Sequence, residues 1–152
     1  IMHNALKFTQ KGKIEFGLSI ENNHVQFIVS DTGIGIPDEF KDNVIINLTF
    51  EFALKIIDFC DELDSLKKFA LSNQLFKAGT SIGANAREAQ NAESRADFIH
   101  KFKIAAKDAD ETEYWLLLCK YSENYPFEEY LLDEIKEIQK IINSIINTSK
   151  GK

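Results

Sequence analysis

The chain has 152 residues, of which 44% are hydrophobic and 28% charged, and its formal net charge is −6. This length suits one domain, or one domain with a fragment. Residues 1–40 carry −2 and residues 41–152 carry −4, so neither part has the basic surplus that broad nucleic-acid binding requires. The sequence has no apolar run near the roughly 20 residues of a membrane span. Cys60 and Cys119 show neither a metal spacing nor a disulfide framework, so we expect buried free thiols in a cytoplasmic protein.

Residues 1–40 predict a short helix followed by a β-hairpin. Apolar residues in positions 1–8 follow a helical period, which Gly12 ends. Two alternating strands follow, and Asn22-Asn23 suits the turn between them because Asn tolerates positive φ. This turn sets a register in which one face carries three apolar pairs: Ile20 with Val25, Leu18 with Phe27, and Phe16 with Val29.

Two motifs in this segment are similar to the ATP-binding domain of sensor histidine kinases. They are Asn4-Ala5-Leu6-Lys7-Phe8-Thr9 and Asp31-Thr32-Gly33-Ile34-Gly35-Ile36-Pro37, which match the N box and the first glycine box. The resemblance implies that Asn4 helps to hold magnesium, that Lys7 lies near the phosphates and that Asp31 accepts a hydrogen bond from adenine. It also implies that Gly33 and Gly35 let the backbone approach the nucleotide.

The kinase-like segment is incomplete as a site. After residue 40 the glycines are Gly79, Gly83 and Gly151, and none lies in a second glycine-rich box. We interpret residues 1–40 as a truncated remnant, either of a gene fusion or of a misjoined reading frame. A lone hairpin is marginal in water, so the segment packs on the rest of the chain, meets another copy or stays poorly ordered.

Residues 41–152 predict four helices. The first is expected over residues 49–63, with Thr49 as N-cap and an apolar face of Phe50, Ala53, Leu54, Ile57 and Cys60. The second is expected over residues 66–91. Its small residues between Gly79 and Ala86 favour close approach of a neighbouring helix over a phosphate-binding loop, because no strand precedes them and no Gly-Lys-Ser/Thr follows.

The third helix is expected to begin after Ser94, which lies three residues before Asp97 as in a capping box, and to end near Tyr121. Pro126 is expected in the first turn of the fourth helix. That helix carries a seam with 4-3-4-3 spacing, made of Leu131, Ile135, Ile138, Ile142 and Ile145. Ile141 and Ile146 widen it, which indicates burial both in the bundle and against a second subunit.

Residues 43–147 resemble the four-helix-bundle proteins encoded in intervening sequences of bacterial 23S rRNA genes. The resemblance lies in these segments: Asn43-Val44-Ile45, Thr49-Phe50-Glu51-Phe52-Ala53, Leu71-Ser72-Asn73-Gln74-Leu75, Gly79-Thr80-Ser81-Ile82-Gly83-Ala84-Asn85, Glu88-Ala89, Ser94, Ala96-Asp97-Phe98-Ile99 and Glu111-Thr112-Glu113-Tyr114-Trp115-Leu116. It implies an up-down four-helix bundle that forms pentameric rings. Nucleic-acid association is implied more weakly, because this chain is acidic.

Several other polar residues could suggest phosphotransfer, metal binding or nucleic-acid binding, but a structural or solvated role explains them more simply. His100 lacks the acid and proline that follow a kinase phosphoacceptor, so a solvated histidine is expected. Glu88, Glu111 and Glu113 form no Glu-x-x-His metal motif, and we expect them to pair with Arg87, Arg95 or Lys107 or to lie at an oligomer seam. Asn85 is expected to be a polar specifier within the core. Seven basic residues could form a local basic surface or could simply belong to a solvated face, which is the more common outcome. They are Lys67, Lys68, Lys77, Arg87, Lys101, Lys103 and Lys107.

The sequence thus predicts a mainly α protein, an up-down four-helix bundle (41–152) preceded by a short helix and β-hairpin fragment (1–40). We expect a non-enzymatic, cytoplasmic homo-oligomer without cofactor or metal, with a pentamer as the favoured assembly and weak nucleic-acid contact as an accessory property. The alternative is an ATP-binding and magnesium-binding fragment of a sensor histidine kinase, with its site at Asn4, Lys7, Asp31, Gly33 and Gly35.

Overall fold

The computed structural model describes residues 14–21, 24–31 and 43–150. The chain divides into two compact units, Ile1–Glu39 and Phe40–Lys152. Each unit is described by itself.

The first unit contains an antiparallel hairpin of β1 (Ile14–Glu21) and β2 (His24–Asp31). Its register confirms the predicted pairs Phe16↔Val29, Leu18↔Phe27 and Ile20↔Val25. The alternation of apolar residues in each strand explains this register, because a slip of one residue would move every side chain to the other face. The predicted short helix over residues 1–8 and the turn at Asn22-Asn23 lie outside the described residues.

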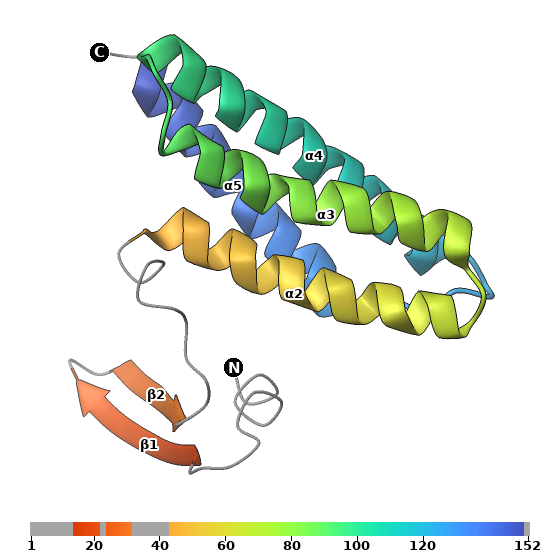
Figure 1. Cartoon of the computed structure of the whole chain (residues 1–152). Coiled ribbons are helices and arrows are strands. Elements are labelled where there is room, and N and C mark those ends of the chain that lie inside the picture. Colours follow the sequence, from red (N-terminus) through yellow and green to blue (C-terminus); the bar gives the residue numbers. More distant parts are fainter. Residues whose placement is uncertain (1–13, 22–23, 32–42, 151–152) are drawn as a thin grey trace. The chain divides into compact units, whose positions relative to one another are not determined.

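The second unit is a bundle of four helices: α2 (Val44–Ser65), α3 (Phe69–Ala89), α4 (Arg95–Tyr121) and α5 (Glu129–Lys150). Consecutive helices run in opposite directions and are joined by short connections (Figure 1), which confirms the predicted up-down topology. The first two helix predictions were displaced at their ends, since α2 begins five residues before Thr49 and α3 begins three residues after Leu66. Within the described ranges, no helix is long and apolar enough to cross a membrane.

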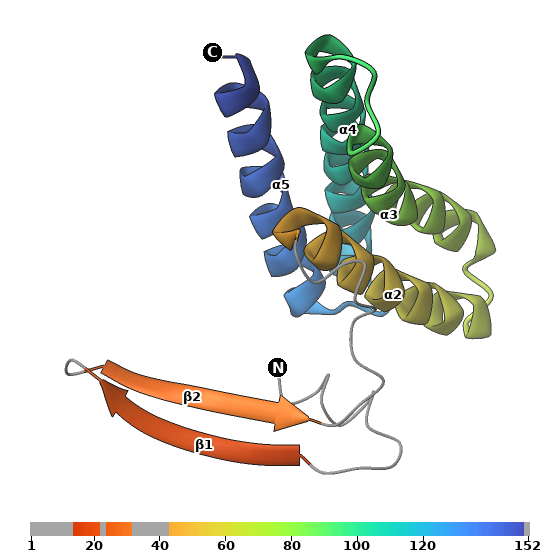
Figure 2. The same ribbon diagram turned by 60° about the vertical axis from the view of Figure 1, so that its left-hand side comes forward.

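Helices α2 and α5 pack against each other along only part of their length. Lys55 of α2 and Glu134 of α5 form a half-buried ion pair with an Nζ–Oε1 distance of 2.6 Å. From this ion pair to its C-terminus, α5 moves away from the N-terminal part of α2, as both views show (Figure 1, Figure 2). Ile141 and Ile145, near that end of α5, are consequently half-buried rather than buried.

The core is built from one apolar stripe of each helix. Phe102, Ala105, Ala109, Leu116 and Cys119 supply it from α4. Five fully buried residues supply it from α5: Leu131, Leu132, Ile135, Ile138 and Ile142. The predicted α5 seam is therefore confirmed from Leu131 to Ile142, but the next core residue is Ile146 and not Ile145.

The predicted core face of α2 was wrong. Of the expected set, only Cys60 is buried, while Phe50, Ala53, Leu54 and Ile57 are half-buried on other sides of the helix. The buried residues of α2 are instead Ile45, Ile46, Thr49, Phe52, Ile56, Phe59, Cys60 and Leu63. Helix α2 is apolar on two sides, so its periodicity alone did not identify the side that faces the core.

The helix ends correct two further predictions and confirm a third. Thr49 is not an N-cap, because it lies inside α2 with its hydroxyl donating to the carbonyl of Ile45 at 2.7 Å. Pro126 lies before the start of α5 and not in its first turn. Ser94 does cap α4, since its Oγ accepts from the backbone N–H of Asp97 at 3.1 Å, which satisfies one of the N–H groups that a helix start leaves unpaired.

Candidate interaction surface

The backbones of α2 and α3 approach closely at two glycines of α3. A Cβ atom placed on Gly79 would lie 2.8 Å from Cγ2 of Ile56, and one on Gly83 would lie 3.4 Å from the carbonyl oxygen of Thr49. Both glycines lie within a continuous helix. The small residues of α3 therefore serve helix packing, as predicted, and do not form a phosphate-binding loop.

Farther along the same contact, α2 and α3 are joined by two reciprocal hydrogen bonds. The hydroxyl of Ser72 donates to the carbonyl of Cys60 at 3.3 Å, and the thiol of Cys60 donates to the carbonyl of Ser72 at 3.5 Å. Burial raises the pKa of the Cys60 thiol to about 11, and it has the same effect on Cys119. Both cysteines are buried free thiols, as expected, and they remain protonated at neutral pH.

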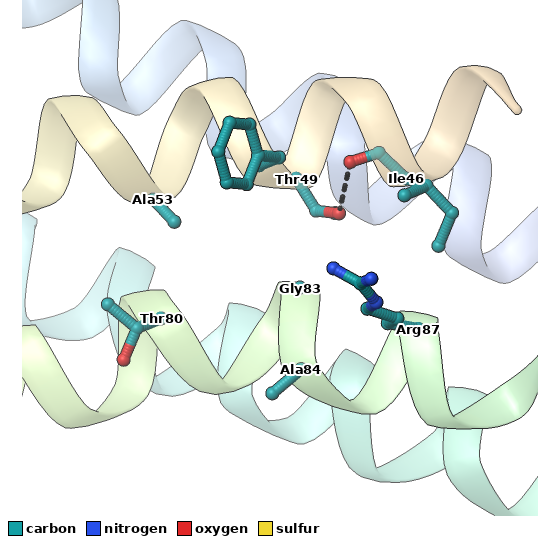
Figure 3. A pocket seen from close by; sticks show the side chains of 8 residues that line it. Ile46, Thr49, Ala53, Thr80, Gly83, Ala84 and Arg87 are labelled. Atoms are coloured by element: carbon teal, nitrogen blue, oxygen red, sulfur yellow. Dashed lines mark hydrogen bonds between the residues drawn. The ribbon is translucent and has the colours of Figure 1, made fainter. Parts of the chain in front are cut away.

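Above Gly83 the two helices leave a shallow groove that opens to the surface (Figure 3). Its volume is about 200 Å³. The lining residues are Ile46, Thr49, Phe50, Ala53, Thr80, Gly83, Ala84 and Arg87. Figure 3 shows the Arg87 side chain reaching from α3 toward α2 at one end of this groove. Small-molecule sites usually measure about 300–1,000 Å³ and enclose their ligand, so the groove suits a side chain of a partner better than a metabolite.

Apolar surface continues beyond the groove on both helices. Ile57 follows Phe50 and Ala53 along α2 and is also half-buried. On α3, Phe76 leaves 44% of its surface exposed one turn before Thr80. We call this continuous region of Phe50, Ala53, Ile57, Phe76 and the groove residues the α2–α3 face. Such patches on soluble proteins commonly mark interaction sites.

Polar contacts join α3 to α4 on the other side of α3. Asn85 donates from Nδ2 to Oδ2 of Asp108 and to the carbonyl of Ser81, both at 3.0 Å. Asn85 and Asp108 are half-buried, so Asn85 is a polar link at the edge of the core and not within it. Burial raises the pKa of Asp108, and the hydrogen bond from Asn85 opposes that rise.

Within the bundle, the three acids considered for chemistry make other contacts than the predicted ion pairs, and their alternative place at an oligomer seam stays a prediction. Glu88 pairs with Lys101, and not with Arg87, Arg95 or Lys107. Glu111 accepts a hydrogen bond from the indole N–H of Trp115 at 3.1 Å. Glu113 accepts one from the side-chain amide of Gln139 at 2.9 Å. In residues 14–21, 24–31 and 43–150, no group of three or more His, Cys, Asp or Glu side chains could hold a metal ion.

Two lysines of the predicted basic surface interact with other side chains of the bundle. Lys101 pairs with Glu88, and the Nζ of Lys68 lies 4.5 Å from the centre of the Tyr125 ring. Lys103 and Lys107 are exposed on α4, one turn apart, and His100 is exposed on the same helix.

Of the five residues predicted to bind ATP, the structure describes only Asp31. Asp31 is the last residue of β2 and is paired with Ile14. Asn4, Lys7, Gly33 and Gly35 lie outside the described residues. The α2–α3 face was missed by sequence reasoning, although its residues Phe50, Ala53 and Ile57 had been recognised as an apolar stripe and assigned to the core.

Comparison with known proteins places the bundle in a family. The model of the 23S rRNA-intervening sequence protein family matches residues 41–144, a range that excludes the kinase-like motifs. A crystal structure of a protein of unknown function from the S23 ribosomal protein family of Bacteroides thetaiotaomicron is 45% identical, with a TM-score of 0.65, and the similarity covers 68% of this chain and 98% of that one. No curated protein matches. The chain therefore belongs to the 23S rRNA-intervening sequence protein family.

Proposed function

We propose that this chain is a non-enzymatic helical module that self-associates through its α2–α3 face, with a pentamer as the favoured assembly. The observation that carries the proposal is the second apolar side of α2, where Ala53 and Ile57 remain half-buried outside the core. A helix that packs in a monomeric bundle needs one apolar stripe. The second stripe of α2 is explained if a further copy of the chain covers it.

Helix α5 is the other candidate for this surface. Its buried residues form one stripe, and the exposed positions between them are polar or charged: Asp133, Lys136, Glu137, Lys140, Asn143, Ser144, Asn147 and Thr148. The sequence had placed the spare apolar width on α5, at Ile141 and Ile146. Ile141 and Ile145 of α5 are half-buried as well. Ala53 of α2, however, borders a groove together with Gly83 and Ala84 of α3, so we now assign the self-association surface to α2 and α3.

A weak contact with nucleic acid is the accessory part of the proposal. Lys103 and Lys107 are exposed one turn apart on α4, and an oligomer repeats this pair in every copy. Repetition raises the effective affinity of a weak site, and phosphate contacts made by lysine weaken as salt concentration rises. We expect RNA binding to be measurable by fluorescence anisotropy only at low salt, and to weaken in the Lys103→Glu/Lys107→Glu variant.

The test of self-association is the native mass of the full chain, measured by light scattering or native mass spectrometry. We expect a mass several times the 17.3 kDa of one chain. Ile57→Asp should shift the mass toward the monomer, because a carboxylate would be desolvated in the apolar contact. Ile141→Asp is the matched control, since it places the same charge at a half-buried isoleucine of α5. A monomeric wild-type chain, or dissociation by Ile141→Asp alone, would overturn the proposal.

The alternative function, an ATP-binding kinase fragment, rests on the sequence motifs alone. The family match begins after those motifs, and no contact in the described residues favours nucleotide binding. Calorimetric titration of the full chain with a non-hydrolysable ATP analogue and magnesium separates the two functions. We expect no heat of binding, whereas an affinity that disappears in Asp31→Asn would restore the kinase interpretation.

A further inference from the structure

We propose that the α2–α3 groove of one copy receives the outward side of α4 of a second copy, with Tyr114 as the side chain that enters it. This inference rests on the proposed self-association and names both surfaces of the contact. Two regions on different helices support it by their shape and charge. One is the groove between α2 and α3, and the other is a tyrosine on α4 with carboxylates beside it.

The receiving surface is apolar at its centre and basic at its edge. Ala53, Gly83 and Ala84 keep the groove open because their side chains are small. Lys77 and Arg87 are exposed on α3, and Arg87 extends over one end of the groove (Figure 3). An occupant that fits this surface combines a flat apolar group with negative charge beside it.

The outward side of α4 has this combination. Tyr114 leaves 55% of its surface exposed, and its ring contacts the Trp115 ring edge-on, with centroids 5.1 Å apart. Asp110 and Glu111 are exposed four and three residues earlier, so they lie beside Tyr114 on the helix surface. The tyrosine therefore projects from α4 with two carboxylates next to it.

Neighbouring side chains hold this region in place. Gln139 of α5 donates from Nε2 to Asp110 at 3.0 Å, and Trp115 donates from its indole nitrogen to Glu111 at 3.1 Å. Both donors are neutral, so they orient the carboxylates without cancelling their charge. A preorganised aromatic group with fixed charges beside it loses little conformational entropy on binding, and tyrosine is common among the residues that dominate interfaces.

The two regions complement each other and are different surfaces of one bundle. Tyr114 would enter the apolar groove while Asp110 and Glu111, which both precede it on α4, approach Lys77 of the neighbouring copy. Because the groove and the tyrosine are different surfaces, the contact is heterologous, and each copy can use its groove on one neighbour and its tyrosine on another. Such contacts close into rings when the rotation between copies permits. A groove-to-groove contact would instead stop at a dimer.

The experiment compares substituted full-length chains by native mass and by dissociation on dilution. Tyr114→Ala and Ala84→Glu both change exposed positions, and we expect each to raise the dissociation constant at least tenfold while circular dichroism shows an unchanged helical content. Tyr130→Ala is the matched control, because Tyr130 is a comparably exposed tyrosine of α5. We expect it to leave the assembly unchanged.

Charge reversal tests the pairing of the two surfaces. Lys77→Glu and Asp110→Lys/Glu111→Lys should each weaken assembly, and the combination of all three substitutions should restore it by at least tenfold. An oligomeric wild type that is insensitive to Tyr114→Ala, a two-fold dimer, or charge reversals without rescue would overturn this inference while leaving self-association intact. A monomeric wild type would overturn both.

Discussion

Gly79 of α3 lies directly against Ile56 of α2, so closely that a Cβ on the glycine would be 2.8 Å from Cγ2 of the isoleucine. Ile56 is fully buried and has no room to move aside. We expect Gly79→Ala to lower the free energy of unfolding by about 1–3 kcal/mol, the usual cost of overpacking a core, in spite of the better helix propensity of alanine. Urea denaturation of the two chains measures this difference.

Gly83→Ala is the matched control for that substitution. A Cβ on Gly83 would lie 3.4 Å from the nearest atom, at the edge of ordinary contact. Alanine is favoured over glycine in helices by about 1 kcal/mol, so we expect Gly83→Ala to be neutral or to stabilise the bundle by up to about 1 kcal/mol. Equal losses at both positions would show that the close approach at Gly79 is not specific.

The connection between α2 and α3 contains a residue in the left-handed region. Lys67 has a φ of 60°, and the N–H of Lys68 bonds the carbonyl of Leu63 at 2.9 Å, as in a Schellman ending. A side chain in this conformation costs roughly 1 kcal/mol that glycine avoids. We therefore expect Lys67→Gly to raise the free energy of unfolding by up to about 1 kcal/mol, measured by urea denaturation.

Lys67→Ala separates backbone strain from any role of the lysine charge. Alanine removes the charge but keeps the Cβ, so it should give little of the gain that glycine gives. A gain in Lys67→Ala equal to that in Lys67→Gly would assign the effect to the side chain instead of the backbone.

Asp108 should make the bundle less stable as pH rises through the carboxyl range. Burial raises the pKa of Asp108 above its ordinary value of 3.8, so the folded chain binds the proton more tightly than the unfolded chain. Between the unfolded and folded pKa values the folded state holds more protons, and stability falls as pH increases. Asp108→Asn should remove this dependence and keep an acceptor for Asn85.

The comparison is made by urea denaturation at a series of pH values. Relative to wild type, Asp108→Asn should gain stability as pH rises through the folded pKa of Asp108, and the gain should level off above it. A difference between the two chains that does not change with pH would show that the folded pKa is not raised.

Cys60 and Cys119 should resist thiol reagents while the chain is folded. Burial raises the pKa of both thiols to about 11, and only the thiolate reacts. At pH 8 we expect a disulfide reagent such as Ellman's to label neither cysteine of the native chain and both after unfolding in urea. Rapid labelling of the native chain would show that α2 and α4 open locally.

Several local features followed from the sequence because they depend on neighbours along the chain. The hairpin register followed from the two-residue turn expected at Asn22-Asn23, with which the apolar alternation of both strands agrees. Ser94 was identified as a cap because the serine hydroxyl and the N–H of Asp97 lie within one turn. The seam of α5 was identified from Leu131 to Ile142, because polar residues bound its apolar stripe on both sides.

The orientation of α2 was decided only by the tertiary structure. Phe50 and Ile57 are as apolar as Phe52 and Ile56, so a helical period fits either side of this helix. Ile56 and Thr49 pack against Gly79 and Gly83 of α3 and are buried, whereas Phe50 and Ile57 are half-buried outside the core. A sequence determines which positions of a helix share a side. Which of two apolar sides is buried depends on the shape of the helix that packs against it.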